Sequence, residues 1–404
     1  MKQLNQSSRS RIATAKNEKN MTRRHTKGRL VDLDIARVIT IIWMIFGHVL
    51  YETLDKQAFS PIAIKRWYYF RGFTSVIFLV LSGLSFSIAT QKTWQAYRPW
   101  LSTQTKRRCR RFVYFLLIGY LLQFDPVTLP GGRTPNTDAL NRLLAFNILH
   151  TIGLSLLLLQ LMTRFCRSYR QLSVLIVILS CAIVGFAPHV NSDIHLPAFL
   201  RSMLSKSTHT IFPLFPTAAY LFIGAVLGDI IIANDLNRLR RLRLALIAIT
   251  TFVIGYAMRY LGWWCYDPNI PSSAMPAYVI EHLGGALLFL FGISAVSRMI
   301  GTYSRSTWIR SISQESLSAY VFHLVLLYTP FGMLGPISAI ARQVSVENRS
   351  LGLGGSLIIA SVICAATLGF TLLWRQVFHA SHHLRRRIWF AWFAYIVASS
   401  IMSR

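Results

Sequence analysis

Long apolar stretches recur along the 404-residue chain, and they constrain its fold more than any other feature. A helix needs about 20 mostly apolar residues to cross the roughly 30 Å hydrocarbon core of a bilayer. Stretches near this length lie at 33–52, 73–90, 110–124, 143–163, 172–187, 211–232, 244–263, 277–297, 312–331 and 353–374. A shorter, aromatic-rich stretch at 388–401 either crosses the membrane or lies in its interface. Because backbone groups find no water in lipid, we expect an all-α, polytopic transmembrane helical bundle of about ten or eleven spans.

The distribution of charge supports this interpretation and predicts an orientation. The chain has 43 Lys and Arg against 14 Asp and Glu, a net charge of +29. In a soluble protein that excess favours nucleic-acid binding, but only 14% of residues are charged, against about a quarter in soluble domains, so no nucleic-acid partner is expected. Most cations fall in segments that ten alternating spans place on one side: 1–29, 92–111, 164–170, 238–243, 298–310 and 375–387. The positive-inside rule then places the N-terminus in the cytoplasm.

Residues 1–29 are polar and basic and lack the apolar core and cleavage site of a signal peptide. We expect a disordered cytoplasmic tail there and one integral-membrane domain at 30–404. The five cysteines form no CxxC motif, and the chain has no HExxH motif and no Walker-type glycine loop. Metal or ATP chemistry therefore has no motif to rest on, and we expect no metal.

Ionisable side chains inside the first span are the strongest functional signal. Asp34, Arg37 and His48 occur at i, i+3 and i+14, which places all three on one helical face at 100° per residue. Arg37 and His48 lie about 16 Å apart along the axis. A local ion pair and a packing histidine would explain any one of them. Three on one face instead favour a functional polar stripe, because exposing it to lipid is costly.

Other spans supply candidate partners. His150 lies in the fourth span, Glu281 and His282 begin the eighth, and His323 lies near the middle of the ninth. A structural role is the simpler interpretation of each histidine alone. Gathered in one bundle, the four residues would line a polar cavity that reaches His48 from the outer face.

These residues carry a resemblance to a family. The spacing Asp34-x2-Arg37-x10-His48 resembles the opening motif of polytopic membrane acyltransferases, those similar to heparan-α-glucosaminide N-acetyltransferase and the related acyltransferase-three group. The stretches 78–89, 106–117, 147–158, 212–229 and 311–327 resemble further family patterns. Val38 and Thr217 depart from them, at positions where the family commonly has Gly and Trp.

The resemblance implies transfer of an acyl group, usually acetyl, from cytoplasmic acetyl-CoA to a sugar hydroxyl or amine of a cell-envelope glycan or lipid-linked saccharide. It also implies the bacterial inner membrane, where lipids are the other partners. Arg108 and Arg111 occupy the family's RxxR positions, and arginine forks suit the phosphates of coenzyme A. His48 would act as general base, or as a transient acyl carrier. Arg37 with Asp34 would position the phosphopantetheine arm of the donor or orient the polar stripe. Glu281, His282, His150 and His323 would face the acceptor.

Two alternatives remain open from the sequence. The polar stripe also suits the proton relay of a multispan transporter or exporter. The chain also suits a non-catalytic envelope-assembly protein on the same scaffold. Replacing His48 distinguishes the enzyme from both.

Overall fold

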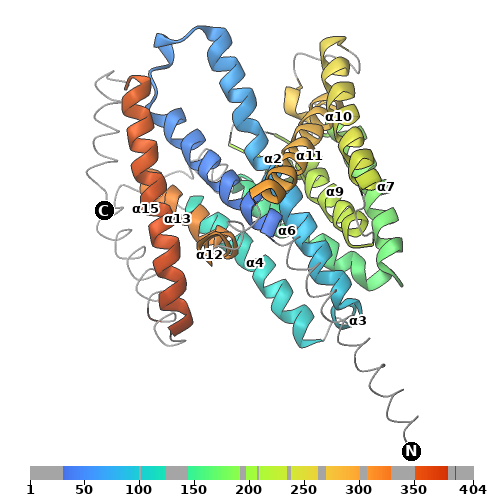
Figure 1. Ribbon diagram of the computed structural model, residues 1–404. Coiled ribbons are helices and arrows are strands. Elements are labelled where there is room, and N and C mark those ends of the chain that lie inside the picture. Colours follow the sequence, from blue (N-terminus) through green and yellow to red (C-terminus); the bar gives the residue numbers. More distant parts are fainter. Residues whose placement is uncertain are drawn as a thin grey trace, which may run out of the picture. The chain divides into compact units, whose positions relative to one another are not determined.

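The computed structural model describes residues 31–99, 102–123, 144–191, 197–206, 209–233, 238–262, 270–300, 307–328, 351–380 and 387. The predicted tail at 1–29 and the stretch 388–401 lie outside these ranges. Regular structure in the described residues is helical, with no strand among them (Figure 1). This confirms the predicted all-α fold class.

Each of the ten predicted spans contains a helix. In chain order these are a first helix, Val31–Thr53, followed by α2 (Pro61–Lys92), α4 (Thr103–Gln123), α6 (Ile148–Phe165), α7 (Tyr169–Val190), α9 (Leu214–Ala233), α10 (Arg238–Tyr260), α11 (Pro276–Ile300), α12 (Thr307–Gln314) with α13 (Ser316–Tyr328), and α15 (Leu353–Ala380). The shorter elements are η1 (Lys56–Ala58), α3 (Trp94–Tyr97), α8 (Ala198–Leu204) and η3 (Ser272–Ala274).

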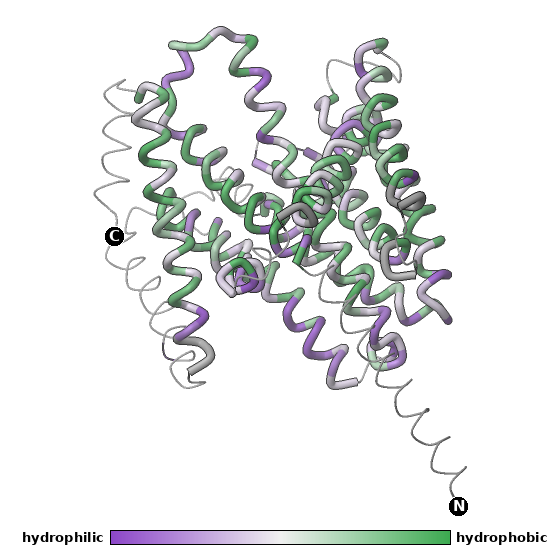
Figure 2. Tube along the Cα trace, in the orientation of Figure 1, coloured by the Kyte–Doolittle hydropathy of each residue, from purple (hydrophilic) through white to green (hydrophobic). Residues whose placement is uncertain are grey.

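Seven of the described helices are long and apolar enough to cross a membrane. They are the first helix, α2, α6, α7, α10, α11 and α15. Figure 2 shows the apolar character of α15 along most of its length. The protein is therefore an integral membrane protein.

Helix α2 differs most from its predicted span. It begins at Pro61, 12 residues before the expected start at 73, and runs for 32 residues. Ser60 caps it by accepting a hydrogen bond from the backbone N–H of Ala63, and proline is well tolerated at a first helical position. The prediction missed this extension because Lys65, Arg66 and Arg71 interrupt the apolar run. At 1.5 Å per residue α2 is about 48 Å long, well beyond the hydrocarbon thickness.

The ninth predicted span is also different, because it consists of two helices. The structure breaks at Glu315, between α12 and α13. The backbone N–H of Glu315 donates to the carbonyls of Ser311 and Ile312, as at a helix end. The apolar part is the 12-residue stretch Ser316–Leu327, shorter than a full span. A carboxylate at the junction separates this stretch from the more polar α12.

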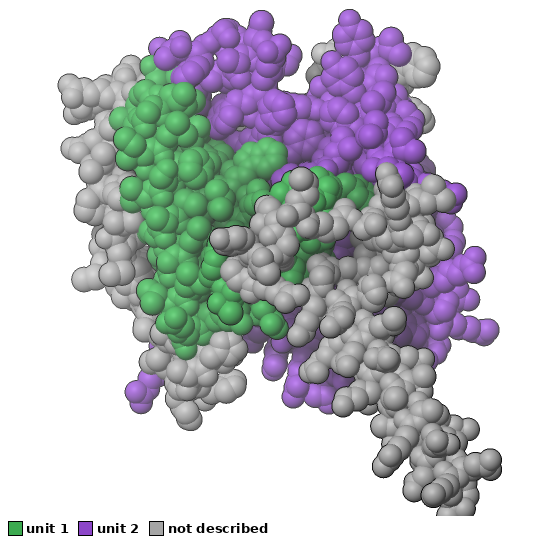
Figure 3. Space-filling view, viewed as in Figure 1, with its two compact units in different colours: residues 1–55, 290–376 green, residues 56–289, 377–404 purple. Residues whose placement is uncertain are grey.

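The chain divides into two compact units (Figure 3). Unit 1 comprises residues 1–55 and 290–376, and unit 2 comprises 56–289 and 377–404. The division falls within α11.

In unit 2, α2 packs against α9 over an extensive contact, and α9 also contacts α7 and α6. Glycines allow the close approach of α2 and α9. A Cβ on Gly83 would lie 1.8 Å from the carbonyl oxygen of Leu221, and one on Gly224 would lie 2.2 Å from that of Val80. Gly228 completes a GxxxG spacing on α9 and faces Ser87. Small residues at such a crossing are typical of membrane helix pairs, because packing rather than hydrophobic burial joins them.

In unit 1, contacts fix the first helix at both ends. Near its start, Asp32 accepts hydrogen bonds from Ser294, at 3.0 Å, and from Ser297 on α11. Beyond its end, the backbone of Thr53 and Asp55 pairs with Leu351 through two hydrogen bonds of 2.9 Å. Phe322 of α13 stacks on Phe370 of α15 with ring centroids 3.9 Å apart. These contacts determine which face of the first helix meets α12 and α13.

The α2–α9 contact yields a stability prediction. Gly224→Ala would place a methyl group against the Val80 carbonyl, and such overpacking costs about 1–3 kcal/mol. We expect a clear fall in the apparent midpoint of thermal unfolding in detergent. Gly185→Ala on α7 is the matched control, because a Cβ there meets nothing within 4 Å. Equal midpoints for the two variants would contradict the close approach of α2 and α9.

Candidate functional site

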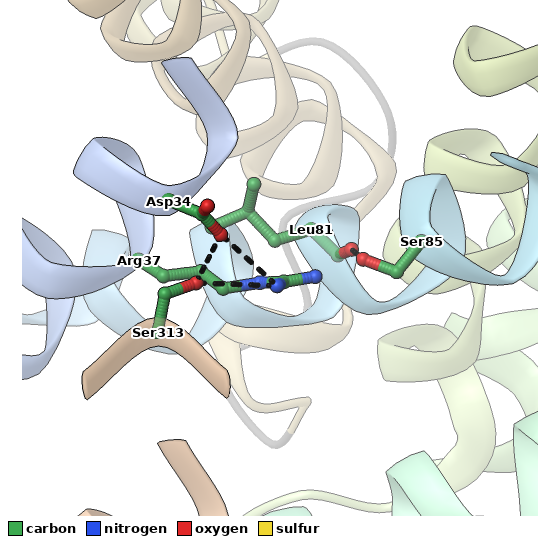
Figure 4. A network of polar contacts seen from close by, with 5 residues as sticks. All are labelled: Asp34, Arg37, Leu81, Ser85 and Ser313. Carbon is green, nitrogen blue, oxygen red and sulfur yellow. Dashed lines mark hydrogen bonds and ion pairs between the residues drawn. The ribbon is translucent and has the colours of Figure 1, made fainter. Parts of the chain in front are cut away.

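The first helix presents two of the predicted residues to α12. The Ser313 hydroxyl donates to the Asp34 carboxylate at 2.6 Å and accepts a hydrogen bond from Arg37 Nη1 at 3.3 Å (Figure 4). Arg37 Nη1 also lies 3.9 Å from Asp34 Oδ1. The side chains of Arg37 and Asp34 are 23% and 16% exposed. The three groups therefore form a compact, largely buried triad in which each contacts the other two.

The third predicted residue of the stripe contacts α13. The rings of His48 and His323 meet edge to face, with centroids 5.3 Å apart. His323 is fully buried and also packs against Tyr320, one turn earlier on α13. The first helix thus brings Asp34 and Arg37 to α12 and His48 to α13. Helix α13 follows α12 directly in the chain.

Hydrogen bonding determines the proton position on His323. Its Nδ1 lies 3.2 Å from the carbonyl oxygen of Ala319, which can only accept, so Nδ1 carries the proton of the neutral ring. The lone pair is then on Nε2. This atom is buried and has no hydrogen-bond partner within the described part of the chain. A neutral imidazole in this state can accept a proton at Nε2.

Ser313 is a site residue that the sequence analysis missed. It lies in the stretch 311–327, whose family resemblance was the available signal. Serine is common at solvent-exposed and helix-end positions, so residue type alone does not distinguish it. Only its contact with two ionisable side chains does so.

Glu281 lies in a separate cluster, in unit 2. Its side chain is fully buried, yet Tyr69 of α2 donates to Oε1 at 2.6 Å and Arg259 Nε of α10 lies 3.0 Å from Oε2. The Arg259 guanidinium also lies over the Tyr69 ring, 5.0 Å from its centroid, and its side chain is 40% exposed. The cation that a buried carboxylate requires is therefore Arg259, which the sequence analysis did not identify.

His282 adjoins this cluster and is enclosed by aromatic rings. It stacks on Phe73 and Tyr278, with centroids 4.5 and 3.7 Å away, and meets Tyr69 edge-on. Its Nδ1 lies 3.0 Å from the Tyr278 carbonyl, so the neutral ring carries its proton there. Its buried Nε2 is therefore a second proton-accepting atom without a partner in the described residues.

His150 has a structural role and the opposite proton position. It is the third residue of α6, and its Nδ1 accepts a hydrogen bond from the backbone N–H of Asn147 at 3.1 Å. The Asn147 side chain accepts in return from the His150 N–H, which completes a capping box. The proton of the neutral ring is then on Nε2. His150 packs against Tyr120 and Phe146, so its cluster differs from that of His282.

The two candidate donor-binding arginines lie on α4 in different environments. Arg108 is buried, with its guanidinium 3.6 Å from the Tyr97 ring centroid and 4.7 Å from that of Phe86. Its Nη1 donates to Thr90 and Gln160, at 2.9 and 3.2 Å. These contacts join α2, α3, α4 and α6. Arg111, together with Arg107 and Arg110, is exposed to solvent and available to a ligand.

The described residues contain no group of three His, Cys, Asp or Glu side chains that could hold a metal ion. The candidate side chains themselves offer acids, bases and hydrogen-bond donors and acceptors. A neutral histidine with a lone pair on one ring nitrogen can accept a proton, as a general base must.

Comparison with known proteins identifies the family. A comparison with curated proteins gave no significant match. The family model described as heparan-alpha-glucosaminide N-acetyltransferase, catalytic, matches residues 29–265. This range includes Asp34, Arg37, His48, Arg108, Arg111 and His150 and ends before Glu281, His282, Ser313 and His323. The match covers more than half of the chain and confirms the resemblance, so the protein belongs to the heparan-α-glucosaminide N-acetyltransferase catalytic-domain family.

Proposed function

We propose that this protein is a membrane acetyltransferase that uses cytoplasmic acetyl-CoA to acetylate a hydroxyl or amine of a cell-envelope glycan or lipid-linked saccharide at the outer face. Bacterial inner membrane, with the N-terminus in the cytoplasm, is the placement that fits this task. The observation that carries the proposal is the pairing of His48 with His323. His48 lies on the first helix, which also supplies Asp34 and Arg37 to the triad with Ser313 of α12.

His48 is the proposed general base. Its imidazole takes the proton from the acceptor O–H or N–H while the acceptor atom attacks the thioester carbonyl. The carbonyl carbon forms its new bond to oxygen or nitrogen, and the C–S bond breaks. The departing thiolate of coenzyme A takes the proton from the imidazolium, which returns His48 to its neutral form.

His323 is the proposed positioning partner. Its Nε2 lone pair lies on a ring that meets the His48 ring edge to face. A lone pair near a newly protonated ring stabilises the positive charge, more strongly in a buried environment than in water. The Ala319 carbonyl maintains this arrangement by fixing the proton on Nδ1.

Arg37 is the proposed contact for the donor. Its guanidinium is a permanent cation, and its contacts with Ser313 and Asp34 keep it oriented. Coenzyme A carries its thioester at the end of a long extended arm. The separation of about 16 Å between Arg37 and His48 along the first helix suits an arm that extends from an anionic group to the reacting carbonyl.

The remaining candidate roles follow from exposure. On α4 we assign the donor phosphates to the exposed Arg111, and a supporting role to the buried Arg108. We assign acceptor binding to the cluster of Glu281 and His282. The acceptor would contact this cluster through the more exposed Tyr69 and Arg259. His150 would affect the acceptor only indirectly, by capping the start of α6.

The direct test uses purified protein in nanodiscs with acetyl-CoA and amino-sugar or hydroxyl-sugar acceptors. Release of free coenzyme A that depends on acceptor, with an acetylated product by mass spectrometry, supports the proposal. Comparison of surface glycans from cells with and without the protein would identify the acceptor. No turnover of acetyl-CoA with any acceptor, together with proton-coupled transport in proteoliposomes, would instead support the transporter alternative.

For the catalytic residue, we expect His48→Ala to lower kcat by about 10²–10⁴-fold, the usual contribution of a general base. His189→Ala on α7 is the control, because that histidine is exposed and has no proposed role in the reaction. The measurement is acetyl transfer under saturating donor. Full activity of His48→Ala would contradict the assignment.

For the triad, we expect Ser313→Ala to lower kcat/KM by about tenfold, since hydrogen bonds to charged groups contribute more than neutral ones. Ser313→Thr keeps the hydroxyl and should restore most of the activity. If the alanine and threonine variants are equally active, the hydroxyl bridge has no role in the reaction.

For the donor, the two arginines of α4 should behave differently. Arg111→Gln should raise KM for acetyl-CoA roughly three- to tenfold at unchanged kcat, because a charged contact to phosphate is lost. Arg108→Gln should mainly lower the midpoint of thermal unfolding, because its buried partners lose their donor. A higher KM for acetyl-CoA in Arg108→Gln alone would reverse these two assignments.

A further inference from the structure

The α6–α7 turn, residues 163–170, comprises the end of α6, the connection and the start of α7, and it carries three arginines. Arg164, Arg167 and Arg170 are exposed, while the residues that precede each of them, Thr163, Cys166 and Tyr169, are buried. Exposed arginines therefore recur at every third position, and the buried residue before each one fixes the segment to the protein. Neither the family match nor the proposed chemistry gives these arginines a role.

A large apolar side chain lies among these cations. Phe165, the last residue of α6, is 75% exposed, one of the highest values among the large hydrophobic residues described. α6 and α7 are both long and apolar enough to cross a membrane, so their shared turn lies where a bilayer surface would be. An exposed phenylalanine beside arginines matches the boundary between acyl chains and headgroups.

The short helix α3 supports the turn. The Trp94 indole N–H donates to the Arg167 carbonyl at 3.2 Å, and the Trp94 ring meets that of Tyr169 at 5.9 Å. At the other end of α3, the Gln160 side chain of α6 donates to the Tyr97 carbonyl at 2.8 Å. Trp94 thus attaches the turn to α3, and Gln160 attaches the preceding part of α6 to α3. Tyr169 attaches the turn to α9 by donating to the Ala225 carbonyl at 3.1 Å.

Charge around the turn is strongly one-sided. The sequence has no Asp or Glu at 56–124 or at 139–192, while Lys92 adds an exposed cation at the end of α2, just before Trp94. A carboxylate does approach α7 one turn farther on, where Ser173 donates to Asp229 of α9 at 2.9 Å. The arginines of the turn therefore face an environment that attracts anions.

We propose that the α6–α7 turn, with Arg164, Arg167 and Arg170 around Phe165, binds the headgroup of an anionic phospholipid. The arginines bind the phosphate, and Phe165 lies against the first part of the acyl chains. A free phosphate compound would satisfy the cations but would leave Phe165 exposed to water, so a lipid is the better fit. The site is independent of the reaction proposed for His48.

The test measures lipid binding by purified full-length protein in nanodiscs that contain phosphatidylcholine with a fraction of phosphatidylglycerol. We expect native mass spectrometry to find retained phosphatidylglycerol on the unmodified protein. In the Arg164→Gln/Arg167→Gln double variant, the apparent affinity should fall roughly tenfold or more, since each cation near an anionic headgroup contributes to binding. Raising the salt concentration should weaken binding to the unmodified protein, because salt screens the attraction between the arginines and the headgroup.

The matched control is Lys65→Gln/Arg66→Gln, two exposed cations near the start of α2. It removes the same charge about 40 Å along that helix from Lys92 and should leave phosphatidylglycerol binding unchanged. An Arg164→Lys/Arg167→Lys variant checks folding and should retain most of the binding. Equal losses in the two Gln double variants would overturn the proposal. So would displacement of the lipid by coenzyme A, which would make the turn a free-phosphate site.

Discussion

The cost of placing charge in hydrocarbon governs the arrangement of this protein. Each ionisable side chain in a span must find a partner inside the bundle, and this requirement determines which helix faces meet. Asp32 and Asp34 bind serines of α11 and α12, and Arg37 shares the Ser313 hydroxyl with Asp34. Glu281 is held by Tyr69 and Arg259. The buried polar clusters therefore set helix orientation, and the candidate functional residues are part of those clusters.

Close backbone packing is the second determinant. Because lipid and side chains are equally apolar, helices gain from association chiefly where their surfaces fit. Gly83 and Gly224 bring α2 and α9 together, and Gly255 similarly admits the backbone of Glu281 against α10. The glycine at 255 thus has a functional consequence, because it allows Glu281 to reach Arg259, which lies one turn farther along the same helix.

The sequence predicted the fold class, the family and ten helical segments, because apolar length and the first-span motif are local signals. The predicted start of α2 was wrong, because cations interrupt its apolar run and the sequence does not show that the helix continues through them. The break at Glu315 was also missed, because a single carboxylate does not show that a helix ends there. Helical geometry alone predicts that Asp34, Arg37 and His48 share one face, and in the structure they contact α12 and α13. Their partners Ser313 and His323 are more than 270 residues away, and no periodicity encodes such pairings. The sequence also could not show that Arg108 is buried while Arg111 is exposed, because the rings of Tyr97 and Phe86 that cover Arg108 lie on other helices.

The length of α2 has a mechanical consequence. One continuous helix carries Tyr69, which binds Glu281, and Thr90, which binds the buried guanidinium of Arg108. These points are 21 residues, or about 32 Å, apart along the axis. A helix without a break resists compression, so an axial shift at Thr90 displaces Tyr69 by the same distance. Through this rod, the arginine-rich end of α4 and the buried carboxylate of α11 are coupled across the full thickness of a bilayer.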